Sequence, residues 1–357
     1  MRLLVSALEH SANIHLEYLL RHLEDDIVLE GIFSSDLGEP LTDLRSGAIM
    51  GLKDALKKIL FFRHLGEEMV KLASDVDAVL LMDSSGFNLP LAKKIKKRYP
   101  RKRIIYYILP QAWAWRRSRI PKLVEYTDRL CSILPFEADY YPEEAPIEYV
   151  GHPLLDEIED YRDHPVEEVR KILFMPGSRR REIEALMPYY REVRRALGDR
   201  EATIAVPPFF DDGSLEEIYG PLDGFEVVRD AREALLKADF AFICSGTATL
   251  EAALIGTPFV LSYIAGKLDY YIVKNILKID RIGLANIFAP HFGCGDDIHP
   301  ELVQDSVNAS TLLEEYEKMD RKAFFENSLR LREYLGRGSA RRVAEIVREE
   351  CHGVIGS

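Results

Sequence analysis

The sequence predicts an α/β protein with two doubly wound, Rossmann-like parallel-sheet domains that face a central cleft. Three observations support this fold class. Short apolar runs rich in β-branched residues alternate with amphipathic helical stretches as far as Val150, which is typical of buried parallel strands covered by helices on both faces. A polar stretch containing Pro165 interrupts the pattern, and the same alternation begins again at Lys171. The chain of 357 residues also exceeds the usual size of one domain.

Five apolar runs predict the strands of the first domain: Leu3–Ala7, Ile27–Phe33, Ala78–Met82, Ile104–Leu109 and Leu130–Leu134. Helical patterns between them include Ile14–Leu23 and Leu89–Arg98. Five further runs predict the second sheet: Lys171–Met175, Ala202–Val206, Phe225–Val228, Asp239–Cys244 and Phe259–Ser262. We expect domains at residues 1–160 and 161–335, followed by a helix at 336–357 that can pack back on the first domain.

The composition limits the classes of function. The net charge of −12 argues against a general nucleic-acid binder, which would normally be basic. The four cysteines form no C-x-x-C pair, so a zinc site or a disulfide framework is not expected, and a reducing cytosol is the simplest compartment. The apolar start of the chain is too short for a signal peptide, and no window is apolar enough to span a membrane. We therefore expect a protein that is soluble or lies on a membrane surface.

In the second half, a predicted strand runs into the tight turn Pro176-Gly177-Ser178 and then into a helix that begins with three arginines. The free N–H groups at a helix N-terminus bind anions, Ser178 can cap the helix, and Arg179 can hold a phosphate with its fork of donors. The alternative is a solvated basic first turn. Because basic side chains oppose the helix dipole at this end, phosphate binding is the stronger interpretation.

A second strand–turn–helix follows at Cys244 to Pro258. Ser245, Gly246 and Thr247 offer hydroxyl and N–H groups to an anion, and Glu251 is placed to accept the hydroxyls of a ribose. The alternative is a well-capped helix. Together the two motifs predict binding of a nucleoside diphosphate, whereas the absence of a Walker A loop and of a G-x-G-x-x-G after a strand weakens ATP hydrolysis and NAD binding.

In the first half, acidic and polar residues follow two predicted strands. Glu9 and Ser11 come after the first strand, and Asp83 comes after the third. A carboxylate at the carboxyl end of a buried strand is a candidate general base, although an N-cap for the next helix is the alternative. Trp113 and Trp115, followed by Arg116, suit a contact with sugar, acyl chain or membrane, and core packing of one tryptophan is an equally good account.

The segment Met50–Leu65 has an apolar face and a basic face. A solvated core helix is one interpretation of this pattern, and a helix in a membrane interface is the other. Residues 50–122 carry a charge of +11, whereas the rest of the chain carries −23, which favours docking on an anionic membrane. The docking side chains would be Leu56, Leu60, Phe61 and Phe62.

These motifs resemble those of the lipid-A-disaccharide synthases, inverting glycosyltransferases of the GT-B fold. The matching stretches run in the family's order over nearly the whole chain: DSSGFN, LPQAWAWR, LPFE, VGHPL, PGSRRREI, SGTATLEAAL and PELVQ. The resemblance implies transfer of diacylglucosamine from its UDP carrier to the 6-hydroxyl of diacylglucosamine 1-phosphate, in lipopolysaccharide biosynthesis. It also implies a peripheral protein on the cytoplasmic face of the inner membrane, with no metal or other cofactor.

The resemblance also assigns residues. The candidate base is Asp83, aided by Glu9, and Arg179 contacts the leaving phosphates. The UDP donor is assigned to Ser178, Arg179, Ser245, Gly246, Thr247, Thr249, Glu251, Asn286 and Gln304. Apart from the resemblance, we assign the acceptor lipid from the residues themselves to Ser11, Asn88, Trp113, Trp115 and Arg116. The charged helices after Asn308 are compatible with a homodimer.

The chain departs from the family pattern at several positions. Two glycines and an Asp of the first-turn motif are replaced, a Pro and an Asp are replaced after the third strand, and a Pro is replaced before Asn286; the residues that stand there are Leu8, Ala12, Asn13, Ser85, Gly86 and Ala285. They leave two alternatives open. One is another GT-B enzyme with a related donor, either a UDP-sugar 2-epimerase or a peptidoglycan glycosyltransferase. The other is an inactive descendant that only binds lipid or nucleotide.

Overall fold

The computed structural model describes residues 1–23, 27–43, 55–113, 116–265 and 281–352. It divides into two compact units, one of Met1–Glu157 with Leu335–Ser357 and one of Ile158–Tyr334. Trp115 and residues 50–54 of the predicted docking helix lie outside the described residues, and so does the side chain of Leu56.

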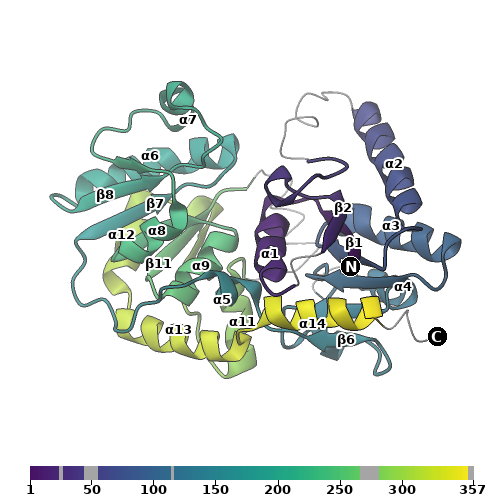
Figure 1. Ribbon diagram of the computed structural model, residues 1–357. Coiled ribbons are helices and arrows are strands. Elements are labelled where there is room, and N and C mark those ends of the chain that lie inside the picture. Colours follow the sequence, from purple (N-terminus) through teal and green to yellow (C-terminus); the bar gives the residue numbers. More distant parts are fainter. Residues whose placement is uncertain (24–26, 44–54, 114–115, 266–280, 353–357) are drawn as a thin grey trace. The chain divides into compact units, whose positions relative to one another are not determined.

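The first unit contains a parallel sheet of six strands in the order β2-β1-β3-β4-β5-β6 (Figure 1). The strands are β1 (Arg2–Ala7), β2 (Val28–Ile32), β3 (Ala78–Met82), β4 (Arg103–Tyr107), β5 (Arg129–Ser132) and β6 (Ile147–Tyr149). The helices are α1 (His10–Leu20), α2 (Ala55–Leu72), α3 (Ser85–Arg98), α4 (Ile120–Tyr126), α5 (Pro153–Glu157) and α14 (Ser339–His352), with short 3₁₀ turns η1 (Ser35–Leu37), η2 (Arg117–Arg119) and η3 (Glu137–Tyr140).

Alternation along β1 explains why both faces of this sheet are covered. Leu3 and Val5 pack in a core that contains residues of α1 and α14. Leu4, between them, packs in a second core with residues of α2, α3 and α4. Successive side chains of a strand point to opposite faces, so an uninterrupted apolar run supplies both cores at once.

The second unit contains another six-stranded parallel sheet, in the order β12-β11-β10-β7-β8-β9. Its strands are β7 (Lys171–Met175), β8 (Glu201–Ala205), β9 (Glu226–Val228), β10 (Phe240–Cys244), β11 (Phe259–Tyr263) and β12 (Glu301–Val303). Its helices are α6 (Arg180–Ala196), α7 (Leu215–Tyr219), α8 (Ala231–Lys237), α9 (Thr247–Ile255), α11 (Leu284–Phe288), α12 (Ala309–Lys318) and α13 (Arg321–Leu335), with 3₁₀ turns η4 (Asp212–Ser214), η6 (Ala289–Phe292) and η7 (Gln304–Ser306).

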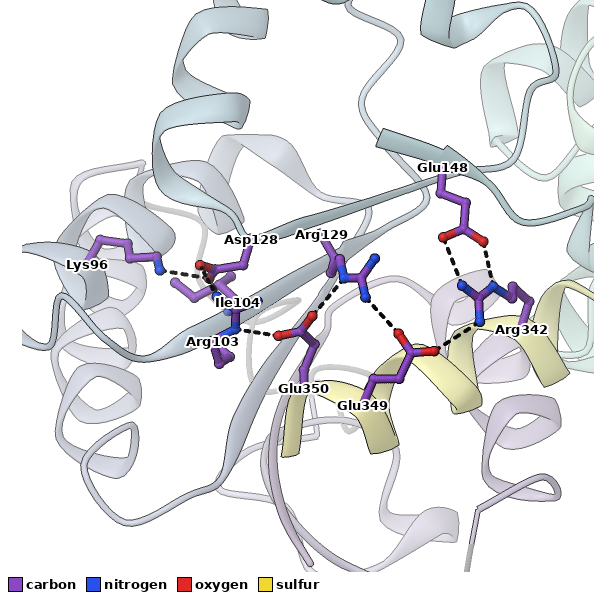
Figure 2. A network of polar contacts seen from close by, with 9 residues as sticks. All are labelled: Lys96, Arg103, Ile104, Asp128, Arg129, Glu148, Arg342, Glu349 and Glu350. Carbon is purple, nitrogen blue, oxygen red and sulfur yellow. Dashed lines mark hydrogen bonds and ion pairs between the residues drawn. The ribbon is translucent and has the colours of Figure 1, made fainter. Parts of the chain in front are cut away.

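Ion pairs and an apolar stripe hold α14 on the first unit, as Figure 2 shows for the ion pairs. The buried carboxylate of Glu350 binds Arg103 and, at 2.7 Å, Arg129. Arg342 binds Glu148 of β6. Since Val343 and Val347 of the same helix are fully buried in the first core, α14 is an integral part of this unit although it ends the chain.

The predicted fold class is confirmed by the two parallel sheets, and the ten predicted strands are present with shifts of one or two residues at their ends. The sequence analysis missed β6 and β12. Both are edge strands of three residues, which is too short for a period of two to be recognised. The predicted helix of residues 50–65 is observed as α2 from Ala55, and it continues to Leu72.

Candidate functional site

Strained backbone gathers where strands end. Among the described residues, five non-glycine residues have positive φ: Asp83 (47°), Ser84 (39°), Ile108 (61°), Arg116 (63°) and Gln304 (57°). Asp83 and Ser84 directly follow β3, Ile108 follows β4, and Gln304 follows β12. Such strain persists only where surrounding contacts enforce it, and it concentrates at ligand sites. In parallel sheets, ligands also bind at the carboxyl ends of the strands.

The turn after β3 is fixed through the main chain of Asp83. Its carbonyl oxygen accepts hydrogen bonds from Tyr106 Oη at 2.6 Å and from Asn88 Nδ2 at 3.0 Å. The side-chain carboxyl is partly buried, and burial raises its pKa above the ordinary range of an aspartate. A raised pKa brings a carboxylate closer to the value that suits a general base.

The side chain of Asn88 holds this turn through hydrogen bonds. Its amide group donates to the carbonyl oxygen of Met82 at 2.9 Å as well as to that of Asp83, and its oxygen accepts from Ser6 Oγ at 2.6 Å. The residue is fully buried. Asn88, which we assigned to the acceptor lipid, is therefore occupied within the protein and has the geometry of a positioning residue.

The first βα turn lies beside the Asp83 turn. The hydroxyl of Ser84 is 3.4 Å from Glu9 Oε1, and Glu9 and Ser11 are exposed at the start of α1. Asn13, which departs from the family pattern, is buried; it donates to the carbonyl oxygens of Ala7 and Glu9 and accepts from Ser34 N at 2.6 Å. The structure thus brings Glu9 to Ser84, the residue that follows the candidate base, and gives Asn13 a role in shaping the first turn.

Sequence analysis missed the contact between His15 Nδ1 and the buried carboxylate of Glu157. The two residues are 142 positions apart, so no local spacing could reveal the pair. Burial raises the pKa of Asp83, and the main-chain N–H of Ser84 and then the nearby His15 side chain act in the opposite direction.

The tryptophan loop packs on aromatic residues of the same unit. Trp113 contacts Phe136 edge to face at a centroid distance of 4.9 Å and lies 6.4 Å from Tyr140. This contact is the core packing considered as an alternative for one tryptophan. Arg116, with its left-handed backbone, precedes η2 and is exposed.

Next to Phe136 in the chain is a buried acid, Glu137, which sequence analysis noted only within the LPFE match. Glu137 Oε2 accepts from Ser132 Oγ at 2.5 Å at the end of β5. Burial raises the pKa of Glu137 to about 7. The residue is 1% exposed, so the first unit contains a carboxyl group that ionises near neutral pH.

In the second unit, the turn after β7 leaves Arg179 available. Gly177 has a φ of +108°, and a Cβ added there would lie 2.7 Å from Glu182 Oε2, so only glycine fits. The side chain of Arg179 is 80% exposed, and its guanidinium binds Glu182 at 2.9 Å. Glu182, which sequence analysis missed, also accepts from the main-chain N–H of Arg179. It thus occupies the donors that a phosphate would use.

The turn after β10 has a similar open geometry. Gly246 has a φ of +141° and open space beside it, and Ser245 and Thr247 lie on either side. Thr249 donates to the carbonyl oxygen of Gly246 at 2.7 Å and is buried, so it holds the turn from within. One turn further, Glu251 binds Arg232 Nη2 at 2.8 Å, a partner that its sequence position did not reveal.

Asn286 and Gln304 do not share one exposed surface. Asn286 is fully buried; it donates to Glu301 Oε1 at 2.8 Å and to the carbonyl oxygen of His299, and accepts from Ile298 N at 2.7 Å. Asn286, which we assigned to the UDP donor, therefore has the geometry of a positioning residue. Gln304 is partly exposed at the end of β12 and donates to the carbonyl oxygen of Ala265 at 3.2 Å.

The docking helix presents part of its predicted apolar face. Ile59 is 64% and Leu60 is 55% exposed, an unusual exposure for large aliphatic side chains. Phe61 and Phe62 are partly buried, and Phe62 lies 5.8 Å from the ring of Phe87 in α3. The contact between Phe62 and Phe87 thus joins α2 to α3. Ile59 and Leu60, in contrast, are exposed to solvent.

Membrane-spanning helices and metal-binding clusters are both absent from the described residues. No helix in that part of the chain is both long and apolar enough to cross a bilayer. No group of three or more His, Cys, Asp or Glu side chains there is arranged to hold a metal ion.

Comparisons with known proteins show which family the chain resembles. The family model described as lipid-A-disaccharide synthetase matches residues 3–344. A lipid-A-disaccharide synthase of Helicobacter pylori (strain Shi470) is 48% identical, with 96% of each chain covered. The synthase of Campylobacter jejuni (strain RM1221) is 42% identical, with 97% of this chain and 99% of that protein covered.

Solved structures of low sequence identity share the fold. A putative UDP-N-acetylglucosamine 2-epimerase from Listeria monocytogenes is 14% identical, with a TM-score of 0.63 over 100% of this chain and 97% of that one. MurG of Acinetobacter baumannii is 13% identical, with a TM-score of 0.61 over 98% of this chain and 99% of that one. These similarities support the expected GT-B fold.

Proposed function

The chain belongs to the lipid-A-disaccharide synthase family, and we propose that it joins two acylated glucosamines with the residues described above. It transfers 2,3-diacylglucosamine from UDP to the 6-hydroxyl of 2,3-diacylglucosamine 1-phosphate and releases UDP. The observation that carries this proposal is the family match over nearly the whole chain, at 42–48% identity to synthases of two genera. Within each unit, the turns that carry the proposed residues follow the carboxyl ends of parallel strands, which supports the proposal: Asp83 follows β3, Arg179 follows β7 and Gly246 follows β10.

The second unit holds the donor. Ser178 and Arg179 at the start of α6, and Ser245 to Thr247 at the start of α9, stabilise the negative charge that grows on the leaving diphosphate. The carboxylate of Glu182 and the diphosphate of the donor compete for the guanidinium of Arg179. When the donor binds, the phosphate takes the place of Glu182. Glu251, fixed by Arg232, accepts the hydroxyls of the ribose. Asn286 acts indirectly by fixing its buried loop, and Gln304 closes the edge of this site.

The first unit activates the acceptor. Asp83 accepts the proton of the 6-hydroxyl while that oxygen attacks the anomeric carbon from the face opposite to UDP, which inverts the configuration. Glu9 lies close enough to the Asp83 turn to bind the same sugar. Ser11, Trp113, Trp115 and Arg116 border the acceptor, and Asn88 holds the turn. Catalysis proceeds without a metal, as the family resemblance implies.

The membrane surface supplies both amphiphilic substrates. Ile59 and Leu60 enter the interface, and Lys57 and Arg63 of α2 face anionic headgroups. Phe61 and Phe62 are partly buried beside them, and Leu56 stays a predicted docking residue. The expected location is the cytoplasmic face of the inner membrane, and a homodimer stays a prediction.

The alternatives have less support. A UDP-sugar 2-epimerase or a peptidoglycan glycosyltransferase shares the fold at 10–14% identity, far below the identity to the synthases. An inactive descendant is tested by the same experiment as the main proposal.

Purified protein is incubated with UDP-2,3-diacylglucosamine and 2,3-diacylglucosamine 1-phosphate in detergent micelles, and the products are analysed by mass spectrometry. We expect the disaccharide 1-phosphate and UDP in equal amounts. Absence of both products under conditions in which the Campylobacter jejuni synthase forms them would contradict the proposal.

A further inference from the structure

An apolar groove of about 190 Å³ runs between α2 and α3 in the first unit. Phe62 and Gly66 line it from α2, and Phe87, Pro90 and Leu91 line it from α3. Pockets that enclose a whole small ligand usually measure about 300–1,000 Å³, so this groove suits part of a larger molecule. The apolar lining suits a hydrocarbon segment.

Gly86 connects the groove with the candidate base. It lines the groove three residues after Asp83, and a Cβ added to Gly86 would meet nothing within 4 Å. The space beside Gly86 is therefore open. Since α3 begins at Ser85, the helix that lines the groove starts at the turn that carries Asp83.

Two cations, Arg63 and Lys94, border the groove. Arg63 is paired with Glu67 at 3.4 Å in the same helix. Lys94 extends from α3 toward α2, because a Cβ added to Gly66 would lie 4.0 Å from Lys94 Nζ and 3.8 Å from Phe87 Cε2. Within the described ranges, no carboxylate forms an ion pair with Lys94. The groove thus has an apolar floor and one uncompensated ammonium group at its edge.

We propose that this groove binds the 2-acyl chain of the acceptor glycolipid, with its 1-phosphate on Lys94. The inference rests on the proposed function and names a subsite for one of its two substrates. In the acceptor, the acyl group at position 2 and the phosphate at position 1 are on adjacent ring carbons. An apolar groove with a cation at its edge matches that pair of groups, and the 6-hydroxyl at the other end of the sugar is left free to approach Asp83. The donor offers no phosphate monoester.

The phosphate contact is tested by kinetics in neutral detergent micelles, with no anionic lipid. Lys94→Ala should raise the KM for the phosphorylated acceptor about five- to tenfold, as expected for loss of one partly screened charged contact, and leave the KM for the donor unchanged. With diacylglucosamine lacking the phosphate, Lys94→Ala and the wild type should have equal KM values. Lys97→Ala, which removes an exposed lysine of the same helix, is the matched control.

The acyl contact is tested by Gly66→Leu, which fills the groove and replaces glycine within a helix by a better helix former. The variant should bind a long-chain acceptor at least fivefold more weakly and glucosamine 1-phosphate without acyl chains as well as the wild type does. An equal KM increase in Lys97→Ala, or a Lys94→Ala effect that persists without the phosphate, would overturn the proposal. Either result would indicate general attraction to a lipid surface.

An error in the proposed groove can be distinguished from an error in the proposed activity. If the wild type formed no disaccharide, binding of the acceptor itself, measured by titration calorimetry, would still compare wild type, Lys94→Ala and Gly66→Leu. Equal affinities of the three proteins for the acceptor would reject the groove as its binding site. Whether the wild type forms the disaccharide tests only the proposed activity.

Discussion

Asn88 Nδ2 donates to the main-chain carbonyl oxygen of Asp83 at 3.0 Å, five residues back along the chain. The bond closes the turn in which Asp83 and Ser84 both have positive φ, a conformation that is costly for residues other than glycine. The oxygen of the same side-chain amide accepts from Ser6 Oγ of β1. The side chain of Asn88 in α3 therefore links β1 to the turn after β3. The position of the candidate base therefore depends on a residue that cannot itself touch solvent.

Asn88→Asp should lower kcat at least about tenfold, because a carboxylate would face the carbonyl oxygens of Met82 and Asp83 in place of an amide donor. The affinity for UDP should be unchanged. The control is Asn308→Asp at the N-cap of α12, where the side chain only accepts from Thr311 N and aspartate caps equally well. A normal kcat for Asn88→Asp would contradict the positioning role.

Asp83→Asn should lower kcat by about a hundredfold or more, since general-base catalysis contributes about 10²–10⁴-fold. In the wild type, kcat/KM should fall as the pH decreases through the pKa of Asp83, because the protonated acid cannot accept the hydroxyl proton. Burial raises that pKa, so the fall should begin above the pH at which an exposed aspartate titrates. A pH profile with an acid limb retained in Asp83→Asn would assign the base elsewhere.

Arg179→Ala should weaken UDP binding about tenfold, the effect of one charged hydrogen bond, and Arg179→Lys should restore it only in part because lysine lacks the planar fork. The matched control is Arg180→Ala, whose guanidinium is already held by Glu184 and Glu217. Titration calorimetry with UDP measures the three variants. Equal losses in Arg179→Ala and Arg180→Ala would point to general charge rather than a specific contact.

Glu137 should make the first unit less stable as the pH rises from about 4.5 to about 7. In this window the native carboxyl keeps a proton that the unfolded chain has lost, so the free energy of unfolding falls with increasing pH, by about 3 kcal/mol at most. Glu137→Gln cannot ionise, so its stability relative to the wild type should increase over the same window and change no further above about pH 7.

Both tryptophans of the chain lie in the first unit, so tryptophan fluorescence during urea unfolding at pH 5 and pH 7.5 reports on that unit. Glu143→Gln, at an exposed position nearby, is the control and should show no such trend. A constant difference between Glu137→Gln and the wild type at both pH values would rule out ionisation of Glu137 in this range.

Leu60→Glu should reduce co-sedimentation with vesicles that contain anionic phospholipid, because the substitution places a negative charge in the apolar contact. Leu329→Glu makes the same chemical change at an apolar side chain of the second unit that is 45% exposed, and it should bind vesicles like the wild type. Similar binding by Leu60→Glu and the wild type would exclude α2 as the docking surface.

The sequence by itself determined the fold class, because a buried parallel strand and an amphipathic helix are encoded by neighbouring residues. It also identified the turns of Asp83, Arg179 and Gly246, each of which follows a recognisable apolar run. It could not show that Asn88 and Asn286 are buried and bonded within the protein, because burial depends on which distant segments pack against a residue.

The tertiary structure alone decided the long-range partners. His15 meets Glu157, Asn286 meets Glu301, and Glu350 of the last helix meets Arg103 and Arg129. The groove bordered by Lys94 also exists only in the folded protein, where α2 and α3 pack together. The sequences of these helices show only apolar and basic residues. Each of these features needs side chains from distant segments to be buried together. The local periodicity of apolar residues does not indicate which segments pack against each other.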